Sequence, residues 1–343
     1  MKVLITGGTG FVGSHTVAAV AAAGHRVKLF VRDPDRIGPA LKPHGLSPSD
    51  CEHTVGDVND TAAISRALHG CEAVIHAGSA YTYALPFWRS SALMKTNVNG
   101  TANVLRAAHQ KRMDPIVYVS SSWAIVQSKP TVVNEETPPG NPPDAYPRSK
   151  MRAERIARRM QAEGAPVVIT YPGGVWGPHD PHWGETAQLV EQILKGKLPF
   201  APPNGTSPFS DVREVARLHA AVLKPNLGPR RYLVPSHSPR FADVLRYVID
   251  ATGRDLTIIT LPDRVVLWPL LPMYWLQALS PVRLPFSYAG PWYVTRSNVF
   301  DESRAQKEFG IEPRPFEDSV RDTVVWMAST GRLDPSLFGR LAA

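Results

Sequence analysis

Apolar and polar positions alternate along the first half of the chain in blocks of two kinds. Short apolar runs stand at 2–6, 26–31, 53–56, 73–76, 116–120 and 167–170. Between them, apolar residues recur at helical spacing over 14–23, 61–68, 98–109 and 145–163. Short apolar strands that alternate with helices are typical of a parallel sheet covered on both faces. The pattern therefore predicts an α/β fold with a doubly wound parallel sheet.

The regular alternation ends near Pro172. Helical patterns then follow at 185–195, 214–223, 241–251 and 316–329, and short strands are predicted at 232–234 and 256–260. We therefore expect a first domain over 1–172 and a smaller, irregular α/β substrate-binding region over 173–343. Part of the second region, at about 209–235, is expected to return to the first domain.

A glycine-rich turn joins the first predicted strand to an Ala-rich helix. Gly7, Gly10 and Gly13 have the spacing that lets a backbone turn sharply and approach a pyrophosphate, and the helix N-terminus offers N–H groups to it. Between a strand and a helix, this spacing predicts a Rossmann-type dinucleotide site, and an ordinary strand–turn–helix connection is the alternative. The residues expected at the cofactor here are Gly7, Thr9, Gly10, Phe11, Val12 and Gly13.

The end of the second strand indicates which dinucleotide is bound. An acidic residue there selects NAD, whereas an arginine suits the 2′-phosphate of NADP. Arg32 is the first polar residue after the apolar run, and Asp33 follows it directly. NADP(H) is therefore favoured and NAD(H) is the alternative. Asp57, after the third strand, is placed to contact the adenine; its other interpretation is a helix N-cap, a role that Asp60 fills at least as well.

Tyr146 and Lys150 are four residues apart and so share one face of a predicted helix. A tyrosine, with a reference pKa of about 10, needs a neighbouring cation to act as an acid–base catalyst near neutrality. Lys150 supplies that charge. Three serines, Ser120, Ser121 and Ser122, end a strand at the edge where parallel sheets bind ligands. Together these residues indicate proton transfer to or from a carbonyl oxygen.

With these motifs in place, the chain resembles the extended short-chain dehydrogenases/reductases of the NAD-dependent epimerase/dehydratase superfamily, in the dihydroflavonol-4-reductase-like and 3β-hydroxysteroid-dehydrogenase-like branch. The resemblance covers about the first 180 residues and extends more weakly over 209–216. The matching segments are 6–13, Asp57-Val58, 74–78, 97–101, Ser120–Ser122, Tyr146-x-x-x-Lys150 and 172–178.

The resemblance implies a role for each matched residue. Ser122 orients the substrate oxygen, with Ser121 as the second choice, and Tyr146 donates or accepts the proton. Lys150 lowers the pKa of Tyr146 and holds the nicotinamide ribose. Asn97 either supports the site or caps a helix. The further cofactor contacts implied are Arg32, Asp57, Val58, Ala77, Gly78, Ser120, Tyr146, Lys150, Pro172 and Val175.

Two departures separate the chain from sugar-modifying members of that superfamily. Trp123-Ala124 follows Ser122 where sugar dehydratases carry an acidic pair, and a glycine of 171–177 stands where sugar epimerases carry an asparagine. We therefore expect reversible carbonyl reduction and alcohol oxidation. A nucleotide-sugar epimerase or dehydratase with tightly bound NAD, and a non-catalytic cofactor-binding protein, are the alternatives.

Aromatic residues near the motifs predict an apolar substrate, a ketone, aldehyde or secondary alcohol. The pocket candidates are Tyr81, Tyr83, Phe87, Trp88, Trp123, Trp176 and Trp183. The apolar segment 265–279 contains two prolines and is too short to span a membrane; it is expected to be a lid, with contact to a membrane surface as the alternative. His179, His182 and the acids around them favour a substrate-contacting loop, and we expect no metal.

Composition narrows the remaining classes. The net charge is +8, but no basic run or basic–aromatic repeat accompanies it, so a phosphorylated cofactor explains it better than nucleic acid does. The two cysteines lack metal-ligand spacing and are expected to be reduced. The apolar strand that begins directly after Met1 leaves no signal peptide in this sequence, so a cytoplasmic enzyme is expected. The resemblance also implies a homodimer.

Overall fold

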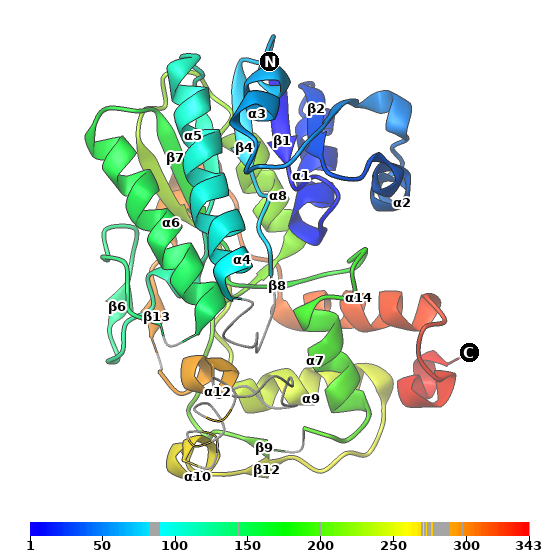
Figure 1. Ribbon diagram of the computed structural model, residues 1–343. Helices are drawn as coiled ribbons and strands as arrows, with labels where there is room; N and C mark the ends of the chain where they lie inside the picture. Colours follow the sequence, from blue (N-terminus) through cyan, green and yellow to red (C-terminus); the bar gives the residue numbers. More distant parts are fainter. Residues whose placement is uncertain are drawn as a thin grey trace.

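A parallel seven-stranded sheet forms the centre of the molecule (Figure 1). The computed structural model describes residues 1–343 except 82–89, 143, 199, 269, 271, 273–275, 277–288, 297 and 343. The strands of the sheet are β1 (Lys2–Thr6), β2 (Arg26–Val31), β3 (Glu52–Val55), β4 (Ala73–His76), β5 (Ile116–Val119), β7 (Val167–Tyr171) and β11 (Arg230–Leu233). Their order is β11-β7-β5-β4-β1-β2-β3, and every neighbouring pair is parallel.

This order confirms the predicted fold class. The chain moves outward from β1 to β3, returns to β4 beside β1, and then continues to the other edge. Strands β4, β5 and β7 are buried at every residue, as expected for strands with helices on both faces. The point where the order reverses lies between β1 and β4, and a ligand crevice forms at such a point in open α/β sheets.

Helices cover both faces of the sheet. The helices on one face are α1 (Phe11–Ala22), α2 (Ile37–Leu41) and α8 (Val212–Ala221). Those on the other are α3 (Thr61–Ala67), α5 (Gly100–Gln110) and α6 (Ala145–Ala162). Each layer contributes a separate apolar cluster, for example Val17 and Leu218 on the first face and Leu105 and Ala157 on the second.

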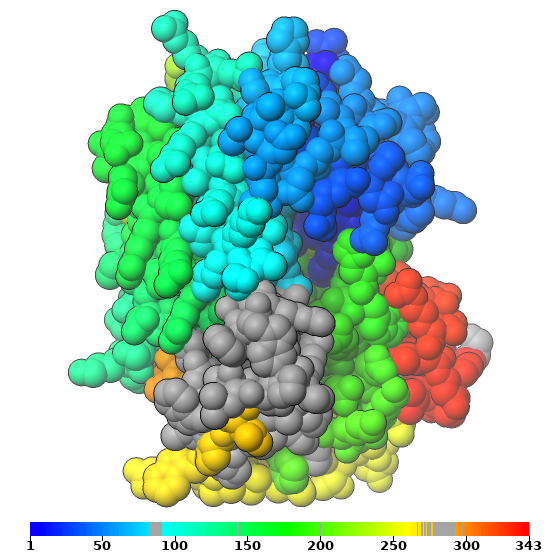
Figure 2. Space-filling view, in the orientation of Figure 1, coloured from blue at the N-terminus to red at the C-terminus, as the bar shows by residue number. Residues whose placement is uncertain are grey.

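A third apolar cluster lies beyond the carboxyl ends of the strands. It is built by α7 (Glu185–Leu194), α9 (Phe241–Thr252) and α14 (Phe316–Ser329), which Figure 1 shows below the sheet. In Figure 2 the blue surface of the N-terminal segments borders the green segment that leads into α7. His44 and His179 meet across this border, with ring centroids 5.9 Å apart.

Short elements complete the described part of the chain. The strand pairs are β6 (Val132–Val133) with β13 (Val299–Phe300), β8 (Gly174–Trp176) with β10 (Phe209–Asp211), and β9 (Phe200–Ala201) with β12 (Ile259–Thr260). The remaining helices are α4 (Ser90–Met94), α10 (Asp263–Leu267), α12 (Ala289–Val294) and α13 (Ser303–Phe309).

Several predicted boundaries differ from the observed ones; for example, α8 begins at Val212 rather than at residue 214. The strand predicted over 256–260 is formed only at Ile259–Thr260. The helix predicted from residue 98 is preceded by a π-helical turn at Lys95–Asn99, and α5 itself begins at Gly100. Helix α1 begins at Phe11 rather than at residue 14, because Gly10 already serves as its N-cap.

Candidate functional site

The glycine turn between β1 and α1 is shaped by two close approaches of the backbone. Gly7 has a φ of +73°, and a Cβ on it would lie 2.6 Å from the Cα of Gly78. A Cβ on Gly13 would lie 1.9 Å from the carbonyl oxygen of Gly7. Gly10 caps α1 without a side-chain hydrogen bond, so no side chain competes for the N–H groups of the first turn. Thr9, Phe11 and Val12 are half-buried around this turn, which fits a pyrophosphate.

The residues after β2 and β3 lie where the adenosine half of a dinucleotide would extend. Arg32 is exposed directly after β2. The Asp33 carboxylate accepts hydrogen bonds from the backbone N–H of Asp35 and from Nε of Arg36, both at 3.1 Å. Asp33 is therefore engaged by its own turn, whereas Arg32 is exposed at the strand end beside it.

Asp57 and Asp60 divide the two roles that the sequence left open. Asp60 caps α3, accepting hydrogen bonds from the N–H groups of Ala62 and Ala63 at 2.9 and 3.0 Å. The Asp57 carboxylate accepts from Asn59 instead, at 2.8 Å from its backbone nitrogen. Because Asp60 fills the cap, the helix-cap interpretation of Asp57 is wrong. The next residue, Val58, packs closely against Gly100 of α5.

The ends of β4, β5 and β7 bring the other candidate cofactor contacts to one edge. Ala77 N–H donates to the carbonyl oxygen of Thr6 at 3.2 Å, and Ser122 N–H donates to that of Pro172 at 2.9 Å. Ser120 and Gly78 follow β5 and β4 on the same edge. Beyond Pro172, Val175 is half-buried in β8, and its carbonyl oxygen accepts from Thr186.

Ser122, Tyr146 and Lys150 form the centre of the candidate site. Ser122 is 1% exposed, and its Oγ has no hydrogen-bond partner among the residues that the structure describes. Ser121 instead accepts from the N–H of Trp123, so its hydroxyl is already engaged. Tyr146 lies in the first turn of α6, with Lys150 one turn later. A buried hydroxyl without a partner is costly, so Ser122 is a suitable group for an incoming oxygen.

Burial dominates the ionisation of Tyr146 and Lys150, and the lowering of the Tyr146 pKa by Lys150 stays a prediction. Burial raises the pKa of Tyr146 to about 12, although a hydrogen bond with Ser79 acts in the opposite direction. Nζ of Lys150 donates to the carbonyl oxygen of Val119 at 2.8 Å. Burial lowers the pKa of Lys150 to about 8, and the Glu154 carboxylate opposes that fall. Desolvation therefore controls both groups in this structure.

Asn97 lies at the centre of a hydrogen-bond network beside Tyr146. Its Nδ2 donates to the carbonyl oxygen of Ala80 and to Oγ of Ser149, both at 2.8 Å. Ser149 then donates to the carbonyl oxygen of Tyr146 at 2.6 Å. Helical backbone on both sides of Asn97 excludes the alternative that it caps a helix. The residue instead ties the loop after β4 to the first turn of α6.

His76 extends this network to the glycine turn. Its Nδ1 lies 2.7 Å from Oγ1 of Thr6, and its Nε2 lies 3.0 Å from Oγ1 of Thr101. Thr101 donates to the carbonyl oxygen of Asn97, so it accepts from Nε2–H of His76. Burial lowers the pKa of His76 to about 3, which keeps the ring neutral. The glycine turn and the start of α6 are thus joined through buried hydrogen bonds.

Aromatic rings surround Tyr146. The ring centroid of Tyr81 lies 4.4 Å from that of Tyr146, and that of Trp123 lies 6.3 Å away. Tyr293 of α12 stacks on Trp123 at 4.3 Å. The hydroxyl of Tyr81 donates to Glu185, and burial raises the pKa of that carboxyl well above its usual range. Sequence reasoning missed Tyr293, because it lies far from every motif.

Two of the predicted pocket residues pack in or against the third apolar cluster. Trp176 is 1% exposed and packs in the third apolar cluster, with its ring centroid 5.4 Å from that of Phe316. Trp183 donates from its indole to Glu191 and lies 5.7 Å from Trp326 of α14. The assignment of Trp176 to the substrate pocket is therefore wrong, and that of Trp183 stays a prediction. The candidates Tyr83, Phe87 and Trp88 lie outside the described residues.

Much of the predicted lid segment 265–279 also lies outside the described residues. Among its described residues, Val265 is 52%, Trp268 73% and Leu276 57% exposed. In the described part of the chain, no helix is both long and apolar enough to cross a membrane. Among the same residues, no group of three or more His, Cys, Asp or Glu side chains is arranged to hold a metal ion.

Comparisons with known proteins agree with this architecture. Residues 3–234 match the model of the NAD dependent epimerase/dehydratase family. A putative dihydroflavonol 4-reductase of Synechocystis sp. is 27% identical over 340 residues, covering 95% of this chain and 94% of its own. A 3-beta-hydroxysteroid dehydrogenase of Mycolicibacterium neoaurum is 25% identical over 91% of this chain and 87% of its own.

The fold also matches a solved enzyme that acts on sugars. The UDP-glucuronic acid 4-epimerase of Bacillus cereus, in complex with NAD, superposes with a TM-score of 0.74. The alignment covers 97% of this chain and 100% of the epimerase at 19% sequence identity, so this likeness concerns the fold alone.

Proposed function

Because this chain belongs to the NAD dependent epimerase/dehydratase family, whose members are enzymes that use nicotinamide cofactors, we propose that it is an NADP(H)-dependent oxidoreductase. Its substrate is a mostly apolar ketone, aldehyde or secondary alcohol. The reaction is reversible carbonyl reduction, with Tyr146 as the general acid and base. In this proposal residues 1–172 bind the dinucleotide and carry the catalytic groups, and 173–343 contribute the substrate side.

The observation that carries the proposal is the pairing of two hydroxyl groups. The Ser122 hydroxyl is buried without a hydrogen-bond partner among the described residues, and Tyr146 lies among aromatic rings. A carbonyl oxygen is the acceptor that such a pair of hydroxyl donors suits. Tyr81, Trp123 and Tyr293 offer apolar surface to the rest of the substrate. The names of the two curated relatives, a dihydroflavonol reductase and a hydroxysteroid dehydrogenase, support ring-bearing apolar substrates.

The residues divide the chemical work between them. Bound nicotinamide supplies the hydride for carbonyl reduction and accepts it in alcohol oxidation. As the carbonyl carbon gains the hydride, Tyr146 gives its phenolic proton to the oxygen, and Ser122 donates a hydrogen bond to the same oxygen. The raised pKa of Tyr146 keeps the phenol protonated at neutral pH, as reduction requires. Lys150, one turn along α6, stabilises the phenolate that remains.

The choice of NADP(H) follows from the turn after β2. Asp33 is held by Asp35 and Arg36, so it is poorly placed to accept from a ribose hydroxyl. Arg32 is exposed at the strand end and suits a 2′-phosphate. Asp57, Val58, Ala77, Gly78, Ser120, Pro172 and Val175 complete the proposed cofactor contacts, as described above.

The experiment that tests this proposal is a fluorescence titration of the protein with NADPH and NADH. The wild type is compared with Arg32→Ala and with Arg26→Ala, which removes an arginine from the opposite end of β2. We expect NADPH to bind more tightly than NADH, and Arg32→Ala to weaken NADPH by about tenfold or more, as loss of a charge-assisted contact does. Arg26→Ala should leave both affinities unchanged.

Other outcomes point to the alternatives. Purified protein that retains NAD, together with tighter binding of NADH, would favour the nucleotide-sugar epimerase. Failure to bind either dinucleotide would overturn the enzymatic proposal, and binding without turnover of any apolar ketone or aldehyde would favour a non-catalytic cofactor-binding protein.

A further inference from the structure

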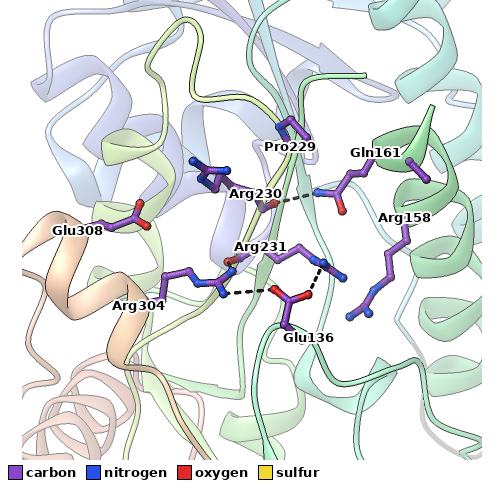
Figure 3. A pocket seen from close by; sticks show the side chains of 9 residues that line it. Glu136, Arg158, Gln161, Pro229, Arg230, Arg231, Arg304 and Glu308 are labelled. Carbon is purple, nitrogen blue, oxygen red and sulfur yellow. Dashed lines mark hydrogen bonds and ion pairs between the residues drawn. The ribbon is translucent and has the colours of Figure 1, made fainter. Parts of the chain in front are cut away.

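A cavity lies at the other end of α6, away from Tyr146. Its volume is about 640 Å³, and its walls come from α6, β11, α13 and the loop after β6 (Figure 3). The lining residues are Glu136, Arg158, Gln161, Ala162, Pro229, Arg230, Arg231, Arg304 and Glu308. Arg158 stands three turns beyond Tyr146 on the same helix, which places it about 18 Å away. The cavity is therefore separate from the candidate catalytic site.

Two guanidinium groups in this cavity share one carboxylate. Arg231 Nη2 lies 2.6 Å from Oε2 of Glu136, and Arg304 Nη2 lies 3.2 Å from Oε1 of the same residue. Figure 3 shows both arginines directed at Glu136. Each arginine makes a single bond to it rather than a bidentate pair. The Glu136 side chain is 60% exposed, and exposed pairs of this kind contribute at most about 1 kcal/mol.

The arginines retain hydrogen-bond donors that Glu136 does not use. Each guanidinium has five N–H donors, and Arg231 spends one of them on this carboxylate. Arg158 uses Nε for Glu154 and Nη2 for the hydroxyl of Tyr171, which leaves Nη1. Arg230, exposed at the start of β11, also lines the cavity, but Figure 3 shows its guanidinium directed away from Glu136. An oxyanion with several acceptor oxygens would satisfy these donors better than the single carboxylate of Glu136 does.

The charge of the cavity also suits an anion. Glu154 balances Arg158, so Arg230, Arg231 and Arg304 remain to face Glu136 and Glu308. Behind them, Glu135 is 3% exposed, lies 4.0 Å from Nε of Arg304, and has its pKa raised by burial. If the side chain of Glu136 rotates toward solvent, three arginines (Arg230, Arg231 and Arg304) remain, against the two carboxyl groups of Glu308 and Glu135. The exposed Glu136 is thus the group that a ligand would replace.

We propose that this cavity is a binding site for a phosphate-type oxyanion, which Arg231 and Arg304 hold in the place of Glu136. The ligand is inorganic phosphate or the terminal phosphate of a small phosphomonoester, since the arginine fork matches the geometry of phosphate oxygens. This site does not depend on the proposed reaction, because none of its residues belongs to the catalytic or dinucleotide-binding set.

Calorimetric titration of the full chain with inorganic phosphate tests the proposal. It is run without dinucleotide and with saturating NADP⁺, so that phosphate bound at the dinucleotide turn is recognised by its loss. We expect binding that persists with NADP⁺ and weakens by about tenfold or more in Arg231→Gln and in Arg304→Gln. Arg246→Gln removes a surface arginine paired with Asp243, outside the cavity, and should bind phosphate as the wild type does.

A variant with the opposite expected effect keeps the test independent of folding defects. Glu136→Gln removes the competing carboxylate and should bind phosphate more tightly than the wild type. Unchanged or weaker binding by Glu136→Gln, or unchanged binding by Arg231→Gln, would overturn the proposal. A parallel titration with phenyl phosphate separates the two sources: tighter binding than inorganic phosphate assigns the site to a phosphomonoester, and weaker binding assigns it to the free ion.

Discussion

Tyr146 is the residue on which the proposed chemistry depends most. Its phenol is protonated at neutral pH because burial raises its pKa to about 12, and the Ser122 hydroxyl offers a second donor to the same substrate oxygen. The two groups arrive from α6 and from the end of β5. Loss of one hydroxyl should therefore reduce turnover without disturbing the dinucleotide turn.

We expect Tyr146→Phe to lower kcat by about 10²–10⁴-fold, because general acid–base catalysis contributes that much. NADPH affinity should change little, since the phenyl ring and its aromatic neighbours remain. Steady-state kinetics with an accepted ketone, beside an NADPH titration, measures both. Tyr247→Phe removes a phenol from α9, where the ring lies 6.2 Å from Phe316, and should leave kcat unchanged. Full activity of Tyr146→Phe would refute the assigned role.

Gly13 is the glycine at which a side chain would be hardest to accommodate, because α1 packs there against the turn that follows β1. A Cβ there would lie 1.9 Å from the carbonyl oxygen of Gly7. Because that oxygen is backbone, the helix must move as a unit to accept even one methyl group. The N-terminus of α1 would then shift away from the proposed position of the phosphates.

For the α1 element, Gly13→Ala should destabilise the protein by about 1–3 kcal/mol through overpacking and weaken NADPH by about tenfold or more. Gly24→Ala, just beyond the other end of α1, is the matched control. Its φ of +82° makes alanine strained, but its Cβ would meet no atom within 4 Å. It should cost stability and leave NADPH affinity intact, as urea denaturation and fluorescence titration can check. Equal losses of affinity in both variants would contradict the prediction.

Helix α6 carries polar side chains at four successive turns: Tyr146, Lys150, Glu154 and Arg158. Glu154 is fully buried, accepts from Arg158 at 2.6 Å, and raises the pKa of Lys150 against the effect of burial. The carboxylate therefore stabilises the charged form of Lys150 from one turn away.

Glu154→Gln should lower the pKa of Lys150 below its present value of about 8. The lysine then loses its proton at a lower pH. In a plot of kcat against pH, the fall in activity at alkaline pH should therefore move toward neutrality. Breaking the buried pair with Arg158 should also cost about 3 kcal/mol of stability. Glu163→Gln, exposed at the end of the same helix, should shift neither quantity. An unchanged alkaline limb in Glu154→Gln would contradict the effect of Glu154 on the pKa of Lys150.

The elements differ in how well the sequence predicted them, for physical reasons. Strands β2 and β4 matched residue for residue, because their apolar runs are bounded by a glycine or polar residues. Strands β8 and β10 were missed, since three residues are too few to show a period. Trp176 was misplaced because its burial depends on Phe316, which is distant in the sequence. Contacts of this kind leave no local signal.

At the scale of the whole molecule, buried neutral histidines join the layers. His219 of α8 lies 2.8 Å from Oγ1 of Thr16 on α1 and 3.1 Å from Oγ1 of Thr170 on β7. Burial lowers the pKa of His219, His76 and His15 to about 3 each. Their pKa values in the unfolded chain are near 6.5, so protonation favours unfolding.

The free energy of unfolding should consequently be constant above pH 6.5 with respect to these groups and fall as the pH drops toward 4. At pH 5 each such histidine accounts for a loss of about 2 kcal/mol. Urea denaturation at several pH values measures the slope. His219→Gln should show a shallower slope whatever its absolute stability, whereas His109→Gln, which is exposed, should keep that of the wild type. Parallel slopes in all three proteins would rule out this origin of acid lability.

Helix α8 and strand β11 are synthesised after the rest of the sheet and after α1, and this affects the growing chain. Strand β11 pairs with β7, and α8 covers α1 beside the glycine turn, yet both come from residues after 211. While the chain grows, its first 172 residues present an unpaired edge at β7 and an uncovered apolar face on α1. The nascent chain is therefore open to aggregation until its second half emerges, and a fragment that ends at residue 172 is expected to be insoluble on its own.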